Sequence, residues 1–113
     1  MMDSYRFGCM VVDGTAYHHD LLVLPTGAPP EWWRLEGHML QREDLAPLLQ
    51  QPSLTLVVGT GMFGMMKVSP SVLDLLAVSG FTPIIERTGI AWKRFNDHLA
   101  RGEKVAGAFH LTC

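Results

Sequence analysis

Residues 54–61 read Leu-Thr-Leu-Val-Val-Gly-Thr-Gly, a β-rich run that ends in glycines. The run carries apolar side chains on both faces, which is typical of a strand covered by helices on both sides of a sheet. We therefore expect residues 54–58 to form a central strand, and we expect a glycine-rich loop to begin at Gly59. Two helix–strand units follow, and together with this run they predict a C-terminal parallel βαβαβ unit.

The first of these units begins with a clear helix start. Ser69 is a favoured N-cap residue, and Pro70 stands at the first helical position, where a missing N–H costs little. Gly80 ends the helix as a residue that readily adopts positive φ. Because the helix is apolar nearly all round, we expect it to be deeply buried. The strand after it spans residues 82–86, and the last strand spans residues 105–111.

The helix of the second unit is amphipathic. Thr88 is its expected N-cap, and Gly102 its expected end. An apolar stripe runs along one side at positions i, i+3 and i+7, formed by Trp92, Phe95 and Leu99. The side chains that we expect to face water are Lys93, Arg94, Asn96 and Asp97.

The N-terminal part of the chain predicts β-structure with more interruptions. Residues 6–11 alternate with strand periodicity. Residues 13–14, Asp-Gly, supply the two positive φ angles of a type I′ hairpin turn. A second strand is expected at residues 15–17, a bend at residues 18–20, and an apolar strand at residues 21–24. The sequence thus predicts an α/β fold that combines an N-terminal β-hairpin with the parallel unit.

The middle of the chain carries loop signals and two short expected elements. The segment 25–30 is rich in Pro and Gly, which predicts a loop. Residues 32–36 fit a short strand. Asp44 is the expected N-cap of a short helix over residues 45–50, with Pro47 in its first turn.

Length and composition limit the class of protein. The 113 residues suit one domain, residues 1–113, and 48% of them are hydrophobic against 18% charged, so one core can form without metal or disulfides. The net charge of −2 argues against a nucleic-acid partner. No stretch approaches the ~20 apolar residues of a membrane span, and the N-terminus lacks a secretory signal. We expect a cytoplasmic protein that binds no membrane.

Two cysteines, Cys9 and Cys113, lie near opposite ends of the chain. A disulfide between them is conceivable, and reduced thiols in a cytosolic protein are the plainer interpretation. Cys9 falls on an apolar strand face, which favours a buried, inert thiol over a nucleophile. The sequence leaves the redox state of both residues open.

Four segments of the chain together suggest a known family. They are Trp32-Trp33-Arg34 with Gly37-His38; Val58-Gly59-Thr60-Gly61 with Gly64 and Met66-Lys67-Val68-Ser69-Pro70; Thr88 with the helix after it; and Gly107-Ala108-Phe109-His110-Leu111-Thr112-Cys113. In order and spacing they resemble the small MTH-type domain family. That family includes the adipogenesis-associated domain protein of animals and, more distantly, a mitochondrial complex I assembly factor.

The resemblance covers nearly the whole chain. It implies an α/β fold in which a β-hammerhead-like N-terminal part packs against the parallel unit. It implies no established activity, because the family as a whole has none. The assembly-factor role is not transferred to this chain, since the sequence carries nothing like a mitochondrial targeting segment.

The glycine-rich loop is the first candidate site. Its Gly59-x-Gly61-x-x-Gly64 spacing matches a dinucleotide fingerprint, but the helix begins only near Pro70 instead of directly after the turn. The glycines either serve backbone geometry alone or free N–H groups to bind a small anion as a nest. The candidate ligand-binding residues are Gly59, Thr60, Gly61, Gly64 and Lys67. Lys67 adds positive charge to such a site, unless it is an ordinary solvated lysine.

No set of residues predicts a metal site or a catalytic triad. His18 and His19 would point to opposite faces of a strand, and His110 and Cys113 do not converge in one either. No Gly-x-Ser-x-Gly elbow occurs. The acid–base candidates, for which the sequence identifies no partner, are Glu36, His38 and Asp44. We therefore expect no metal and no cofactor, and we lean against an enzyme.

The adjacent tryptophans form the second candidate site. In a strand, one of Trp32 and Trp33 faces the core, and the exposed ring, together with Arg34, is suited to anchor a protein partner. Alternatively, both rings cover the end of a small core. We favour a non-catalytic interaction or accessory domain of the assembly type. The alternative is a small-molecule or anion-binding protein, an enzyme included, with its site at residues 59–67. The sequence identifies neither ligand, partner nor oligomeric state.

Overall fold

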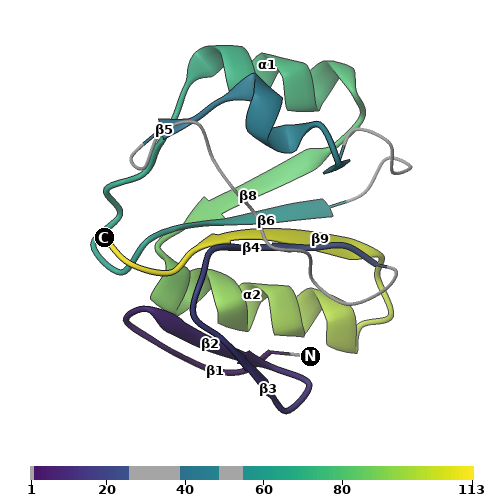
Figure 1. The fold of residues 1–113 in the computed structure, drawn as a ribbon. Helices are drawn as coiled ribbons and strands as arrows, with labels where there is room; N and C mark the ends of the chain where they lie inside the picture. Colours follow the sequence, from purple (N-terminus) through teal and green to yellow (C-terminus); the bar gives the residue numbers. More distant parts are fainter. Residues whose placement is uncertain (1, 26–38, 49–54) are drawn as a thin grey trace.

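The computed structural model describes residues 2–25, 39–48 and 55–113. Within these ranges the chain forms a mixed α/β fold around a four-stranded sheet in the order β4-β9-β6-β8 (Figure 1). Its strands are β4 (Leu21–Val23), β6 (Thr55–Thr60), β8 (Thr82–Glu86) and β9 (Val105–His110). β6 pairs in parallel with β8 and β9, whereas β4 runs antiparallel to β9.

Helices cover both faces of this sheet (Figure 1). One face carries α1 (Pro70–Val78) and the 3-10 helix η1 (Arg42–Leu45), and the other carries α2 (Thr88–Ala100). The predicted parallel βαβαβ unit is confirmed. A short parallel pair, β5 (Met39–Leu40) with β7 (Lys67–Val68), precedes α1 and was not expected from the sequence. None of the helices in the described ranges is long and apolar enough to cross a membrane.

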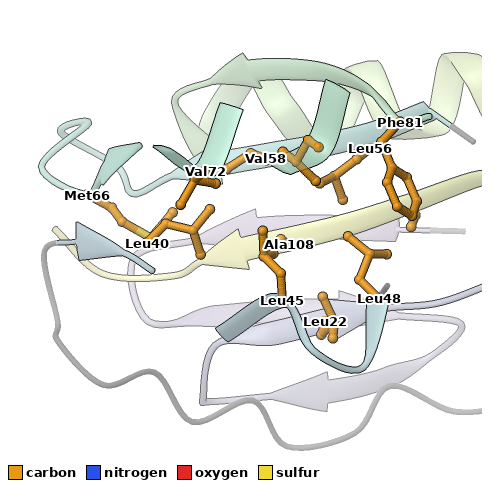
Figure 2. Close-up of a cluster of buried hydrophobic side chains, with 12 residues drawn as sticks. Leu22, Leu40, Leu45, Leu48, Leu56, Val58, Met66, Val72, Phe81 and Ala108 are labelled. Atoms are coloured by element: carbon orange, nitrogen blue, oxygen red, sulfur yellow. The ribbon is translucent and has the colours of Figure 1, made fainter. Parts of the chain in front are cut away.

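The two faces of the sheet have separate hydrophobic cores. Leu56 and Val58 of β6 belong to the cluster beneath α1, and Val57 belongs to the cluster on the α2 side. Figure 2 shows the first cluster, where side chains from the strands meet Leu45 of η1 and Val72 of α1. Burial on both faces confirms that this run of the chain is a central strand, as its apolar pattern predicted.

A separate antiparallel sheet packs against α2 and consists of β1 (Met2–Arg6), β2 (Cys9–Val12) and β3 (Thr15–Tyr17) (Figure 1). Asp13 with φ 48° and Gly14 with φ 82° confirm the predicted hairpin turn. The single strand predicted over residues 6–11 is wrong, because the chain turns at Phe7 and Gly8. Within β2 the side chains that join the core on the α2 side are Met10 and Val12, so the alternation over residues 6–11 revealed neither the turn nor the buried face.

The start and the end of α1 agree with the sequence prediction, but its burial does not. Ser69 Oγ accepts the Val72 N–H at 3.3 Å, and Gly80 ends the helix with φ 85°. The prediction of deep burial is wrong: only Val72 and Leu76 are buried, and Val78 is 88% exposed. A helix nine residues long that lies on one face of a sheet can bury one side only, whatever its other sides carry.

Two of the predicted N-caps, Asp44 and Thr88, are wrong. Asp44 lies inside η1, and its Oδ2 accepts the N–H of Gln41, the residue before that helix, at 2.8 Å. The helix predicted over residues 45–50 is replaced by this earlier 3-10 helix, and residues 49–50 lie outside the described ranges. Thr88 is already the first residue of α2, so Arg87 is the cap position. The Thr88 hydroxyl bonds to Gly61 and His110 instead of capping the helix.

α2 is attached to its neighbours by apolar and polar contacts. Phe95 is buried as predicted and meets the Phe109 ring edge-on, with centroids 5.9 Å apart. Leu99, also placed on the apolar stripe, is instead exposed. Asn96 was expected to face water, and that prediction is wrong: its Oδ1 accepts the Met2 N–H at 2.9 Å, and its Nδ2 donates to the Met2 carbonyl at 2.7 Å.

Candidate functional site

The C-terminal ends of β6 and β9 meet the β1–β2 turn near the C-terminus (Figure 1). The loop after β6 folds around residues 111–113, and its Met62 N–H donates to the Thr112 carbonyl at 2.7 Å. From the N-terminal sheet, the Gly8 N–H donates to the Leu111 carbonyl at 2.8 Å. This short C-terminal segment therefore joins the glycine-rich loop to the N-terminal sheet.

Thr88 is the polar centre of this junction. Its hydroxyl donates to the His110 carbonyl at 2.6 Å and accepts the Gly61 N–H at 2.9 Å. Its own N–H donates to the Gly61 carbonyl at 3.1 Å. The hydroxyl thus uses its donor and one acceptor position on buried backbone groups. The sequence marked Thr88 only as a helix cap, because nothing local reveals partners 27 and 22 residues away.

The first two glycines of the loop are explained by close packing. A Cβ on Gly59 would lie 2.7 Å from Thr88 Oγ1, and a Cβ on Gly61 would clash with the backbone of Cys113. Gly61 also has φ 100°, a conformation that side chains rarely tolerate. Gly59 belongs to β6, which extends two residues beyond the predicted end at Val58. The backbone-geometry explanation of these glycines is therefore sufficient.

The N–H groups of the loop mostly donate within the protein. Gly61 donates to Thr88, Gly64 donates to the Gly61 carbonyl at 3.2 Å, and Met65 donates to the Cys113 carbonyl at 2.9 Å. Lys67 is exposed and belongs to β7. Anion binding at Gly59, Thr60, Gly61, Gly64 and Lys67 stays a prediction, and an anion bound there would compete with these hydrogen bonds.

An Asp–His pair lies beneath the junction. Asp20 Oδ2 is 2.9 Å from His110 Nδ1, and Asp20 Oδ1 accepts the Leu111 N–H at 2.9 Å. The side chains are only 15% and 6% exposed, and the pair anchors the end of β9. Tyr5 donates to the Leu111 carbonyl at 2.8 Å. Burial, and then the negative charge of Asp20, raise the pKa of the Tyr5 hydroxyl above its usual value.

The two segments that meet at this junction carry exposed large apolar side chains, which we call the aromatic patch: Phe7 and Phe63, whose rings are neighbours, and Met65, two residues after Phe63. They are 49%, 59% and 47% exposed, respectively. The rings of Phe7 and Phe63 come from distant parts of the chain, yet their centroids are 6.3 Å apart. The patch thus joins the β1–β2 turn to the glycine-rich loop. Sequence reasoning missed it, because Phe7 was assigned to a continuous strand and Phe63 to a loop chosen for its glycines.

Three exposed basic residues lie on or beside the segments that carry the aromatic patch, and we call them the basic rim: Arg6, Lys67 and Arg87. Arg6 adjoins Phe7 in sequence, Lys67 follows Met65 by two residues, and the Arg87 side chain packs 3.4 Å from the position of a Cβ on Gly64. All three residues are exposed. Among the residues that the structure describes, none of the three forms an ion pair with a carboxylate. Their charge is therefore available to an external group.

The remaining predicted site residues are not brought together. Trp32, Trp33, Arg34, Glu36 and His38 lie outside the described residues. Asp44 is buried and caps η1. Cys9 is buried, and both it and Cys113 are free thiols. In the parts of the chain with a described placement, no group of three or more His, Cys, Asp or Glu side chains is arranged to hold a metal ion.

A family described as a protein of unknown function, DUF498/DUF598, matches residues 2–110 of the chain. The chain belongs to this family. The match runs from the first residue of β1 to the last residue of β9, so it covers the aromatic patch and both α-helices and stops before residues 111–113. The family description gives no biochemical activity, so membership leaves the function to be argued from the structure.

Solved structures share the fold. The conserved hypothetical protein PH1505 from Pyrococcus horikoshii is 26% identical, with a TM-score of 0.85 over 100% of this chain and 99% of that chain. An outer membrane protein from Bartonella henselae has a TM-score of 0.85 at 20% identity, over 99% and 94%. A Mth938-like domain protein from Bordetella pertussis has a TM-score of 0.69 at 20% identity, over 96% and 83%. The resemblance to MTH-type domains is thereby confirmed.

Proposed function

We propose that this protein is a non-catalytic interaction or accessory domain, which binds an apolar, acidic segment of another protein through the aromatic patch. One observation carries the proposal: Phe7 and Phe63, from distant parts of the chain, are held in contact while about half of each side chain is exposed. Exposed apolar side chains that cluster, as opposed to lying singly, mark binding surfaces on soluble proteins.

The patch is supported as an interface by how it is held. The β1–β2 turn is fixed to the Leu111 carbonyl through Gly8, and the loop that carries Phe63 is fixed to the carbonyls of Thr112 and Cys113. Rings on such anchored turns lose little conformational entropy when a partner covers them. Aromatic side chains are also favoured at the energetic centres of interfaces.

The basic rim selects the chemistry of the partner. Three exposed cations lie on or beside the segments that carry the patch, although the whole chain carries a net charge of −2. A segment with apolar side chains at its centre and carboxylates at its edges complements this arrangement. The rim charges contribute more to orientation and association rate than to affinity.

Non-catalytic binding also fits the structural use of two groups that could act as acid or base. The Asp20 carboxylate and the His110 ring are 15% and 6% exposed and hold β9, and the Thr88 hydroxyl holds backbone groups. We place the protein in the cytoplasm as part of the proposal. Two free cysteines are what a reducing compartment favours.

The test is affinity capture with matched variants. The full chain, Phe63→Asp, and the double variant Arg6→Glu/Arg87→Glu are immobilised and exposed to an extract of the source cells, and bound proteins are quantified by mass spectrometry. Leu99→Asp is the control, because Leu99 is an exposed apolar residue at the opposite end of α2 from the junction. Circular dichroism verifies that each variant is folded.

We expect at least one protein that wild type and Leu99→Asp bind in equal amount. Phe63→Asp should retain about tenfold less of this protein, or even less than that. The rim variant should also retain less of it than wild type does. The captured protein should then bind directly in purified form. A set of bound proteins that is the same for wild type and Phe63→Asp would contradict the proposal.

A further inference from the structure

The methionines of this chain differ widely in exposure. Of the six that the structure describes, Met65 is the most exposed, at 47%, and Met39 follows at 38%. The next residue after Met65, Met66, is 2% exposed and lies in the core beneath α1 (Figure 2). Two neighbouring methionine side chains therefore lie in opposite environments, one at the surface and one among packed apolar groups.

This contrast decides which methionine can react with an oxidant in solution. The sulfur of a thioether gives an electron pair to one oxygen of hydrogen peroxide, the O–O bond breaks, and the products are the sulfoxide and water. The sulfoxide is polar where the thioether was apolar, and methionine sulfoxide reductases reverse the change. A thioether that is packed in the core is shielded from peroxide. The exposure of the two residues therefore predicts that Met65 reacts well before Met66.

The backbone of Met65 is held independently of its side chain. Its N–H donates to the Cys113 carbonyl at 2.9 Å, and the Met62 N–H of the same loop donates to the Thr112 carbonyl at 2.7 Å. The Met65 side chain belongs to neither hydrophobic cluster. Oxidation at its sulfur therefore leaves the loop and both cores in place, and it changes only the chemistry of the surface, two residues from Phe63.

We propose that Met65 is a site of reversible oxidation by hydrogen peroxide, and that its sulfoxide closes the aromatic patch to the protein partner. The second half of this inference rests on the function proposed above. A partner that places apolar side chains on Phe7, Phe63 and Met65 must take the sulfoxide oxygen out of water without giving it a hydrogen-bond donor, which opposes binding. The basic rim keeps its charges, so oxidation acts on the apolar part of the surface alone.

The site is tested by fragment-ion mass spectrometry of the purified full chain after treatment with hydrogen peroxide. A Cys113→Ser background removes the partly exposed thiol as a competing target. We expect the sulfoxide to form about tenfold or more faster at Met65 than at Met66 or the buried Met10. In urea-unfolded chain the three residues should react at similar rates. Equal rates at Met65 and Met66 in the folded chain would overturn the site.

The effect on binding is tested with the purified protein that Phe63→Asp fails to capture. Peroxide treatment should weaken its binding by about tenfold, and methionine sulfoxide reductase should restore it. Met65→Leu keeps an apolar side chain without sulfur, so it should bind and should lose the sensitivity to peroxide. Met65→Gln, which is polar and uncharged, should weaken binding without peroxide. Met39→Leu is the control at the other exposed methionine and should stay sensitive.

The outcomes separate this inference from the proposed function. If oxidised Met65 leaves binding unchanged while Phe63→Asp still loses it, the regulation is overturned and the proposed function stands. A Met65→Leu variant that stays sensitive to peroxide would also overturn the regulation. If no protein depends on Phe63, the proposed function fails and the regulation with it, whereas the oxidation rates still decide whether Met65 is the modified site.

Discussion

α1 and α2 cover opposite faces of one sheet, yet they are attached to it in different ways. α1 is mostly apolar, buries only Val72 and Leu76, and leaves Val78 88% exposed. α2 is the more polar helix and is nevertheless the better integrated, through Phe95 in the core and hydrogen bonds from Thr88 and Asn96 to distant backbone. The overall hydrophobicity of a helix therefore does not measure its attachment. An apolar side that the fold leaves exposed is available for association.

The largest effect that separates the two helices should come from Phe95→Ala. The ring is 3% exposed and packs on Phe109, so its loss should lower the free energy of unfolding by about 3–5 kcal/mol. Val78→Ala on α1, studied at low protein concentration, should change it by less than about 0.5 kcal/mol. Urea unfolding measures both. Similar losses for the two variants would show that the helices are attached alike.

Thr88→Val tests the polar attachment of α2. The change keeps the shape of the side chain but leaves the His110 carbonyl and the Gly61 N–H without the hydroxyl, which should cost about 1–3 kcal/mol in urea unfolding. Thr88→Ser keeps the hydroxyl and is the matched control, with a smaller expected loss. If Thr88→Val and Thr88→Ser lower the free energy of unfolding equally, the hydrogen bonds of the hydroxyl would not explain the loss.

Several features of the two helices were predictable from the sequence, and the reasons differ. The order of strands and helices in the C-terminal half follows from periodicity, from Ser69-Pro70 and from Gly80, all of which are local signals. Which side of α1 is buried is not local, because every side carries apolar residues and only the sheet decides among them. The caps at Asp44 and Thr88 failed because each polar side chain found a partner other than the expected N–H groups.

The candidate site was predicted in part. The loop after β6 was singled out for its glycines, and the structure does place it at the junction, but the exposed rings there were not anticipated. Phe7 and Phe63 are 56 residues apart in sequence, and only tertiary packing brings them together. A turn recognised at Phe7-Gly8 would have predicted a solvent-exposed Phe7. The uninterrupted alternation of residues 6–11 favoured a single strand instead.

A smaller effect should appear at high pH, on the α2 side of the sheet. Burial and the charge of Asp20 raise the pKa of Tyr5 in the folded protein above that of the unfolded chain. The folded state therefore holds this proton more tightly, so its contribution to stability is complete below the unfolded pKa and is lost as the pH rises through the folded pKa. Ultraviolet titration of wild type and Tyr5→Phe should show that the transition lost with Tyr5 lies above the usual tyrosine pKa. A variant that loses a transition at the ordinary tyrosine pKa instead would contradict this assignment.

The smallest expected effect concerns anions at the glycine-rich loop. Because most loop N–H groups already donate within the protein, phosphate should shift the amide signals of Gly59, Gly61 and Gly64 only weakly and at high concentration. Lys67→Ala should reduce any shift that is seen. If these signals stay still while others move, the anion-binding alternative loses its support and the glycines serve packing alone.

The aromatic patch, and not the outer face of α1, is the surface that we expect to receive the protein partner. The decisive measurement is amide chemical-shift mapping of the isotope-labelled chain, titrated with the captured partner. We expect shifts confined to residues 6–8 and 62–67 and to Arg87, with residues 71–78 unchanged. Shifts centred on α1, with residues 6–8 and 62–67 unmoved, would contradict the proposed function.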